Sequence, residues 1–283
     1  MKAYELYENL ENDFINSALT DEWAKYMSEI ESYVCNNFKK RSMGLVCDFT
    51  DNINKVYTAV FPDEKVMEKI LDERIEEAML FVHHPAIWDI KRPSGAFHNI
   101  PVELLESFKR RKISIYNLHV PLDNFGEYST SKVLAEALDF EIEKPFAKYF
   151  GSQSGVICKS KIDSVEKIHQ KVSELVKHDV KLYQYGNSKI RSGKIAVIAG
   201  GGNDKEFVLE MLENDVNTLV TGITCKSSRT EALHSFEQEN KINIIGATHY
   251  STEKFACIEI CKYFNKLGLP SEFLEGEAIM EDM

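Results

Sequence analysis

The spacing of apolar and polar positions changes character about forty residues into the chain. Before that point, apolar side chains recur every three or four residues, which predicts helices. These positions are Leu6, Leu10 and Phe14, followed by Trp23, Tyr26, Met27, Ile30, Tyr33 and Val34. Asp21 precedes the second group and is expected to cap a helix there. We assign these helices a structural role.

From Lys55 onward, strand and helix patterns alternate. The segment KVYTAVF predicts a strand, and the segment that begins at Pro62 predicts a helix. A strand at MLFVHH, a helix at VELLESFKRRK and a strand at ISIYNLH follow. This succession is typical of an α/β fold in which mostly parallel strands are covered by helices.

The same succession returns from Lys194. The segment KIAVIAGGG predicts a strand and a turn before a helix. The segment LVTGI predicts the end of a second strand, and KINIIGATH predicts the end of a third. Strand–helix units resemble one another by chance, but here the whole order is kept, which favours a structural duplication. We therefore predict an α/β fold of two similar halves, residues 1–145 and 146–283, that face each other across a cleft. Residues 150–192 are expected to add a strand, a helix and a strand to the second half.

Histidines stand at the ends of three of these strands. In parallel α/β folds, ligands gather beyond the carboxyl ends of the strands. Two carboxylates follow closely, in HVPLD and HYSTE, and the histidine and glutamate of HYSTE can share one face of a helical turn. The residues concerned are His83, His84, His119, Asp123, His249 and Glu253.

Nitrogen and carboxylate donors together are typical ligands of divalent zinc, iron, manganese or nickel. Six donors exceed what one tetrahedral ion needs, so they favour two ions with one bridging carboxylate. Adjacent side chains on an extended segment point in opposite directions, so each histidine of the tandem pair can serve a different ion.

Other interpretations of these residues remain open. A histidine pair before Pro85 is also typical of a strand end with backbone partners, and the histidines can be core residues of a metal-free α/β protein. Gly200, Gly201 and Gly202 fit a tight turn slightly better than an anion-binding loop. The remaining histidines are not followed by a carboxylate four residues later and are expected at the surface: His98, His169, His178 and His234.

Composition and charge disfavour nucleic-acid-binding, membrane-spanning and secreted proteins. The formal net charge of −11 disfavours a polyanionic partner such as nucleic acid. The chain has no apolar window long enough to span a membrane, and its acidic N-terminus does not resemble a signal peptide. The six scattered cysteines are expected to be small buried apolar residues in a reducing compartment, so we predict a cytoplasmic protein.

Several short motifs, taken in order, resemble a known family. They are GLV at Gly44, FVHHP at Phe81, NLHVPLD at Asn117, IAGGG at Ile198, LVTG at Leu219 and THYSTE at Thr248. The combination is similar to the NIF-three-like dinuclear-metal proteins, many of which are labelled GTP cyclohydrolase 1 type 2 homologs. The chain departs from that pattern at Ile223, where relatives often have an acidic residue, and lacks the usual Trp-Asp-Asn segment before Gly44.

The resemblance implies a two-domain α/β protomer that assembles into a toroidal homohexamer. It implies that two divalent metal ions are held by five ligands, with Glu253 as the bridge, and that His119 lies close to them as a proton-transfer residue. The five implied ligands are His83, His84, Asp123, His249 and Glu253.

From the residues and the resemblance together, we interpret the chain as a metal-dependent hydrolase. Its expected substrate is a nucleotide or another small phosphorylated or cyclic-amide molecule. The alternative is a non-catalytic metal-binding scaffold or regulatory adaptor, because ligands alone do not prove turnover.

Overall fold

The computed structural model describes residues 1–88, 97–98, 100–202 and 204–283, with the backbone alone at 88, 97 and 98. The chain divides into two compact units. Unit 1 consists of Met1–Leu122 and Cys257–Gly276, and unit 2 of Asp123–Ala256 and Glu277–Met283. The expected halves 1–145 and 146–283 stay a prediction, since compactness alone does not show which segments fold separately.

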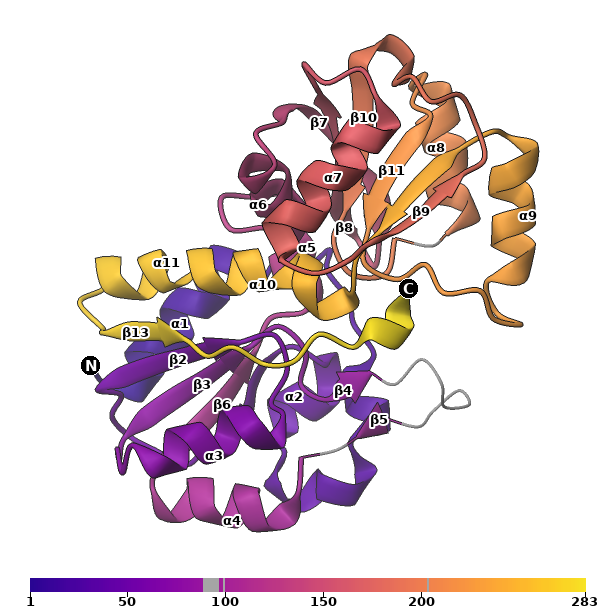
Figure 1. Cartoon of the computed structure of the whole chain (residues 1–283). Helices are drawn as coiled ribbons and strands as arrows, with labels where there is room; N and C mark the ends of the chain where they lie inside the picture. The colour runs from indigo at the N-terminus through magenta and orange to yellow at the C-terminus, as the bar shows by residue number, and fades with distance from the viewer. Residues whose placement is uncertain (89–96, 99, 203) are drawn as a thin grey trace. The chain divides into compact units, whose positions relative to one another are not determined.

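Unit 1 contains a five-stranded sheet in the order β1-β6-β3-β2-β13 (Figure 1). β1 is antiparallel to β6, and the other neighbours are parallel. The strands are β1 (Gly44–Cys47), β2 (Lys55–Ala59), β3 (Ala78–Val82), β6 (Ile113–Asn117) and β13 (Ser271–Phe273), and a separate hairpin pairs β4 (Ile87–Trp88) with β5 (Phe97–His98).

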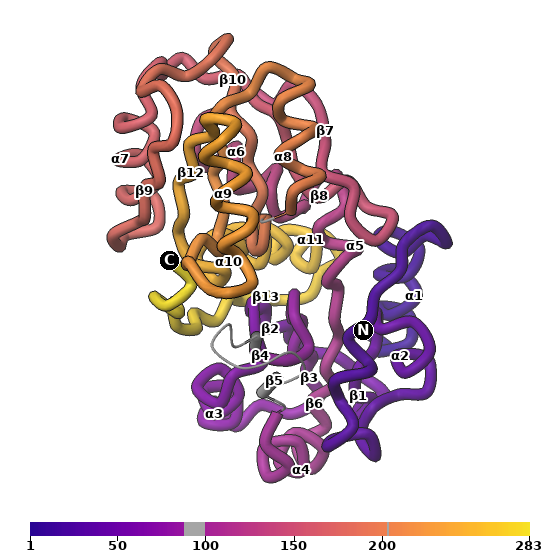
Figure 2. Tube along the Cα trace, turned by 90° about the vertical axis from the view of Figure 1, so that its right-hand side faces the viewer, coloured from indigo at the N-terminus to yellow at the C-terminus, as the bar shows by residue number. Residues whose placement is uncertain are grey.

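Helices cover both faces of this sheet because successive residues of its buried strands point to opposite sides. Leu80 and Val82 join the core cluster formed with α3 and α4, which lie next to each other in Figure 2. Phe81 points the other way and contacts Phe264 of α11, with ring centroids 5.5 Å apart. The helices of unit 1 are α1 (Ala3–Phe14), α2 (Asn36–Arg41), α3 (Glu64–Asp72), α4 (Val102–Arg110) and α11 (Cys261–Lys266).

Two expectations about helices in unit 1 are wrong. The second apolar group forms two short 3₁₀ segments, Trp23–Tyr26 and Ser28–Tyr33, instead of an α-helix. The helix expected from Pro62 begins at Glu64, because the Asp63 carboxylate accepts the Val66 N–H at 2.8 Å and caps it there.

Unit 2 contains a six-stranded sheet in the order β7-β8-β10-β11-β12-β9. β10, β11 and β12 are parallel, and the flanking pairs are antiparallel. The strands are β7 (Glu141–Tyr149), β8 (Ser152–Lys159), β9 (Lys181–Gln184), β10 (Lys194–Ile198), β11 (Thr218–Thr221) and β12 (Asn243–Gly246).

Helices also cover both faces of the second sheet (Figure 1). One core cluster joins the sheet to α6 and α7, and another joins it to α8 and to Phe236 of α9. The helices are α6 (Thr130–Ala137), α7 (Val165–Val176), α8 (Lys205–Glu213) and α9 (Glu231–Glu239), while α5 (Val120–Asp123) and α10 (His249–Glu259) each contain a boundary between the units.

The structure confirms the α/β class and the two sheets. In both units, three consecutive parallel strands, β2-β3-β6 and β10-β11-β12, alternate with helices in the predicted order. The strand, helix and strand expected within residues 150–192 are β8, α7 and β9.

The six cysteines are all free, but only half of them are fully buried. Cys47, Cys158 and Cys257 are buried as expected, whereas Cys35, Cys225 and Cys261 are partly exposed. Burial raises the pKa of the Cys158 thiol to about 12, which makes it a weak nucleophile.

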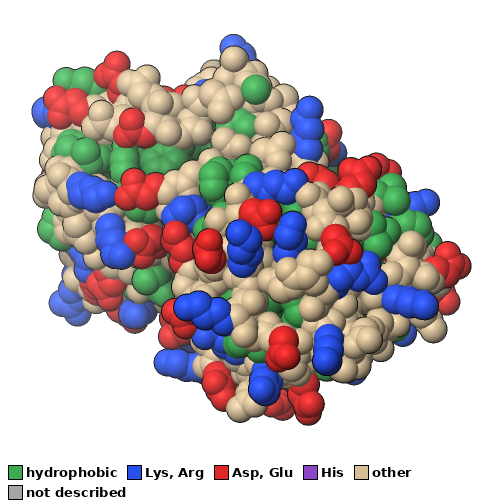
Figure 3. All heavy atoms as spheres, turned by 90° about the horizontal axis from the view of Figure 1, so that it is seen from above, with side chains coloured by type: hydrophobic (Ala, Val, Ile, Leu, Met, Phe, Trp, Pro, Cys, Tyr) green, Lys and Arg blue, Asp and Glu red, His purple; other side chains and the backbone are tan. Residues whose placement is uncertain are grey.

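No helix in the described ranges is long and apolar enough to cross a membrane. On the face drawn in Figure 3, lysine and arginine side chains alternate with aspartate and glutamate. That face therefore carries no continuous patch of one charge.

Candidate metal centre

The parallel strands of unit 1 deliver three histidines to one place. His83 and His84 directly follow β3, and their backbone N–H groups continue the sheet by donating to Ala59 and Val60. His119 follows the neighbouring strand β6 two residues after its end. Neighbouring parallel strands end on the same edge of a sheet, so this sequence pattern brings the three side chains together.

The three imidazoles form a close cluster. Their ring centroids lie 4.3 Å apart for His83 and His84, 4.7 Å for His84 and His119, and 5.3 Å for His83 and His119. One nitrogen of each ring lies within 4.8 Å of the others, a spacing that a metal ion can span. His83 and His84 are at most 1% exposed.

Fixed neighbours orient these rings. His83 Nδ1 lies 3.0 Å from the carbonyl oxygen of Leu118, which favours a proton on Nδ1 and a lone pair on Nε2. His84 stacks on Phe61 with centroids 5.0 Å apart and meets the edge of Trp23. Histidine ligands are typically held in this way, by a carbonyl or carboxylate on the second ring nitrogen.

His119 has a carboxylate partner that the sequence pattern missed. Asp21 Oδ2 and Trp23 Nε1 both lie 2.9 Å from His119 Nδ1. A ring nitrogen either donates or accepts, and the bond to a charged carboxylate is the stronger one. The Asp21 side chain is only 4% exposed, so this pair favours a proton on Nδ1 and a lone pair on Nε2. Asp21 therefore holds a histidine instead of capping an α-helix.

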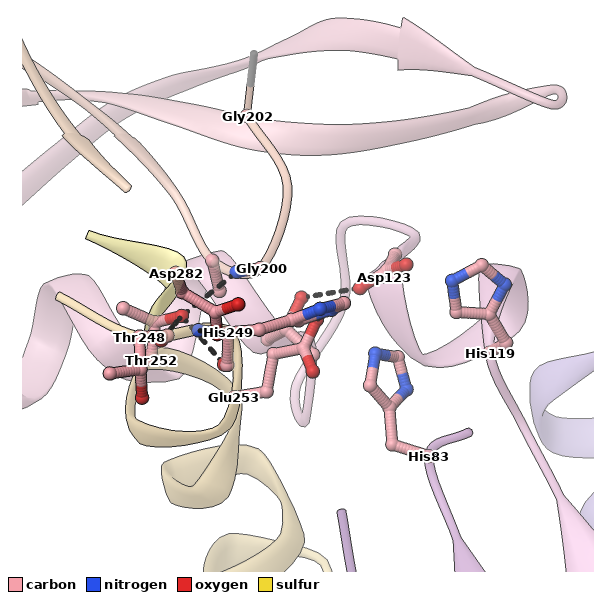
Figure 4. Close-up of polar contacts among 12 residues, drawn as sticks. His83, His119, Asp123, Gly200, Gly202, Thr248, His249, Thr252, Glu253 and Asp282 are labelled. Carbon is pink, nitrogen blue, oxygen red and sulfur yellow. Dashed lines mark hydrogen bonds and ion pairs between the residues drawn. The ribbon is translucent and has the colours of Figure 1, made fainter. Parts of the chain in front are cut away.

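Unit 2 contains three further donor residues, the pair His249 and Glu253 and the separate Asp123. His249 and Glu253 lie one turn apart on α10, and His249 Nε2 is 3.0 Å from Glu253 Oε1. The Asp123 carboxylate accepts the Thr130 hydroxyl at 2.7 Å, which fixes one of its oxygens (Figure 4). Asp123, His249 and Glu253 are less than a tenth exposed.

The glycine segment after β10 leaves space for the Glu253 carboxylate. Gly200 has a φ of +70°, and a Cβ there would lie 2.1 Å from Glu253 Oε1. The Gly200 and Gly202 N–H groups donate to Thr252 Oγ1 and Thr221 Oγ1 at 2.9 and 3.0 Å. The interpretation as a turn is therefore favoured over an anion cradle, because these amides already have acceptors within the protein.

The C-terminal residues contribute another carboxylate that the sequence pattern missed. The Asp282 carboxylate accepts the His249 backbone N–H at 2.9 Å (Figure 4). Burial raises the pKa of Asp282 above its ordinary value. No spacing rule connects Asp282 to the histidine motif, so only the fold reveals this contact.

The expectation that the remaining histidines lie at the surface is wrong for His234. Its side chain is buried on α9, between the Thr224 carbonyl oxygen and the Tyr185 hydroxyl, each 3.1 Å from a ring nitrogen. His169 and His178 are partly exposed, and the His98 side chain lies outside the described part of the structure.

Comparisons with known proteins show the family to which the chain belongs. The model of the Duf34/NIF3 (NGG1p interacting factor 3) family matches residues 24–277. A GTP cyclohydrolase 1 type 2 homolog from Borreliella burgdorferi is 29% identical over 213 residues, which cover 75% of this chain and 78% of the relative. A protein of the same name from Pyrococcus horikoshii is 28% identical over 245 residues, or 84% and 90% of the two chains.

Solved structures share the fold. The protein ybgI, described as of unknown function, has a TM-score of 0.75 at 17% identity and covers 99% of this chain and 100% of its own. Reduced HcgD from Methanocaldococcus jannaschii has a TM-score of 0.69 at 23% identity, with 98% of each chain covered. The buried histidine and glutamate groups can hold a metal ion, and the family match spans them, so the chain is a member of the Duf34/NIF3 family.

Proposed function

We propose that this chain binds two divalent metal ions and uses them to hydrolyse a nucleotide or another small phosphorylated or cyclic-amide substrate. In the proposed set, Glu253 is the bridging carboxylate. The proposed ligands are His83, His84, Asp123, His249 and Glu253.

The buried histidine cluster of unit 1 is the observation that carries this proposal. Three imidazoles with nitrogens within 4.8 Å of one another repel if they are protonated. A divalent cation bound by His83 and His84 would instead be attracted to their lone pairs, with His119 beside it. The Leu118 carbonyl beside His83 Nδ1 and the Asp21 carboxylate beside His119 Nδ1 both favour the tautomer that carries its lone pair on Nε2.

The donor types restrict the metal and its chemistry. Nitrogen and carboxylate oxygen without thiolate suit zinc, iron, manganese or nickel. When bound, two such metal ions would act as Lewis acids and would lower the pKa of a bound water molecule toward neutral pH. His119, oriented by Asp21, is the residue that we assign to proton transfer, because its Nε2 is an acceptor in a buried site.

The test begins with protein purified without an affinity tag or added metal. Elemental analysis is expected to find about two divalent ions per chain, and turnover on a panel of nucleotides, phosphoesters and cyclic amides should stop after chelation. Bound metal without turnover on any of these would favour the scaffold or adaptor instead. Absence of bound metal, also after incubation with each of the four ions, would reject the proposal.

Changing a ligand in either unit is expected to release metal. His83→Ala and His249→Ala should each weaken binding by at least about 100-fold, since even residues that only orient a ligand are worth about 10- to 100-fold. His178→Ala is the matched control, because this partly exposed histidine binds the Asp179 carbonyl. Metal dissociation constants from competition with a chelating dye measure the effect. Loss in only one of the two variants would contradict the proposed ligand set.

Gly200→Ala is expected to remove metal without a ligand being changed. The new methyl group would take the place of Glu253 Oε1, so the carboxylate must turn away. Gly268→Ala is the control, since Gly268 has a similar φ of +78° and a Cβ added there would meet no other atom within 4 Å. Both variants should lose about 1 kcal/mol of unfolding free energy to backbone strain, and Gly200→Ala should lose more because it also displaces the Glu253 carboxylate. Urea unfolding measures this loss, but only Gly200→Ala should lose metal. Equal metal content in the two variants would contradict the role of Glu253.

A further inference from the structure

The last residues of the chain pack against the helix that carries two of the proposed ligands. Glu277–Met283 belong to unit 2, and Asp282 in the final 3₁₀ turn is 2% exposed. Residues 278–283 follow the span 24–277 that the family model matches. Their contacts to the helix are therefore a feature of this chain beyond the matched region.

Two separate sets of hydrogen bonds satisfy the backbone N–H groups at the start of α10. Thr248 and Ser251 bind each other reciprocally: the Ser251 N–H donates to Thr248 Oγ1, and the Thr248 N–H donates to Ser251 Oγ, both at 3.0 Å. This exchange resembles a capping box. The His249 N–H lies between these two residues and donates instead to Asp282 Oδ2 at 2.9 Å. A first-turn amide has no acceptor within its own helix, so Asp282 supplies one from outside.

The backbone of Asp282 fixes a second segment. Its carbonyl oxygen accepts the N–H groups of Thr224 and Cys225 at 2.7 and 2.8 Å. Just before these residues, the Gly222 and Ile223 N–H groups donate to the Gly200 carbonyl at 2.9 and 3.1 Å. Asp282 thus joins the start of α10 to the loop after β11, which in turn holds the glycine beside Glu253.

We propose that Asp282 is a positioning residue of the metal centre, an inference that rests on the proposed function. It fixes the first turn of α10, where His249 begins the helix and Glu253 follows one turn later. Without an external acceptor, this turn frays, and the His249 ring moves away from the geometry that it shares with Glu253. The role depends on an accepting oxygen at this position, and Asp282 itself contacts no substrate.

The experiment compares Asp282→Ala with Asp282→Asn in the full chain. Alanine removes the acceptor, whereas the asparagine side-chain oxygen can still accept the His249 N–H. We expect Asp282→Ala to weaken Mn²⁺ and Co²⁺ binding by about 10- to 100-fold and to change the visible spectrum of the Co²⁺ form. Asp282→Asn should restore most of the affinity and the spectrum. Glu281→Ala, an exposed neighbour, is the control and should behave as the wild type.

Thermal unfolding of the metal-free proteins separates positioning from stability. A lower melting temperature for Asp282→Ala with unchanged affinity and spectrum would show a merely structural role and overturn the inference. Failure of Asp282→Asn to restore binding when it folds as the wild type does would also overturn it. If the wild type binds no divalent ion, zinc, iron and nickel included, the proposed function fails, and this inference fails with it. If it binds only one of those three, the same comparison of variants is made with that ion. Metal binding by the wild type with an unaffected Asp282→Ala rejects the inference alone.

Discussion

Glu253→Gln is expected to lose bound metal almost completely while the protein stays folded. Glutamine keeps the size of the side chain and can still hydrogen-bond His249 Nε2, which lies 3.0 Å from Glu253 Oε1. It does not keep the negative charge that a bridging ligand needs to hold two cations together. The expected loss of affinity exceeds about 100-fold, the upper end for residues that only support a ligand. Elemental analysis and dye competition measure it.

Glu259→Gln is the matched control for this change. Glu259 ends the same helix and forms an ion pair with Lys262 at the surface. Such pairs are worth at most about 1 kcal/mol, so this variant should keep its metal. If Glu253→Gln also keeps its full metal content, Glu253 is not the bridge, and the assignment of two ions must be abandoned. Both outcomes are independent of whether a substrate is known.

The candidate ligands at the strand ends could be predicted because each is marked by a local sequence pattern. His83, His84 and His119 each follow an apolar strand, and parallel strands in consecutive βαβ units end on one edge of a sheet. His249 and Glu253 are four residues apart, which is the spacing of one helical face. In each case, a few neighbouring residues contain the whole signal.

The supporting residues could not be predicted because their contacts are not local. Asp21 looked like a helix cap, but it precedes two 3₁₀ segments and contacts His119, which lies 98 residues further along the chain. Asp282 reaches His249 only through the fold of unit 2. The pairing of β13 with β2, which aligns Ser271 with Val56, likewise joins distant segments without a sequence signal.

His234 illustrates the same limit for burial. Its helix is polar, and the sequence predicted an exposed side chain. The atoms that bind it belong to Thr224 and Tyr185, which precede it by ten and 49 residues. The acidic residue that it faces, Glu237, is 1% exposed and was not singled out by any motif. This pair leads to a prediction about stability that is separate from the metal centre.

Glu237→Gln is expected to stabilise the protein by about 3 kcal/mol at pH 7. Burial raises the pKa of Glu237 from 4.5 to about 8, and His234 Nδ1 lies 3.4 Å from Glu237 Oε2. Burial lowers the pKa of His234, which disfavours the cation that would offset a carboxylate. The folded protein therefore binds a proton at Glu237 more tightly than the unfolded chain does.

The tighter proton binding at Glu237 in the folded state determines how the free energy of unfolding changes with pH. Between pH 4.5 and about 8, the folded state holds more protons at Glu237 than the unfolded state, so this residue makes the free energy of unfolding fall as pH rises. Below that window Glu237 is protonated in both states, and Glu237→Gln should match the wild type closely. Above it, the stabilisation by glutamine should reach a constant value.

Urea unfolding of both proteins from pH 4 to pH 9 tests this expectation. His234 contributes an opposite slope at acid pH, since its lowered pKa stabilises the fold only above its ordinary value, so the difference between the two proteins is the informative quantity. Glu239→Gln, an exposed glutamate two residues further along α9, should show no such difference. A pH-independent effect of Glu237→Gln would mean that the carboxylate is already ionised in the folded protein. The buried pair would then have to be a charged His234–Glu237 ion pair, and removing one partner should destabilise the fold at every pH.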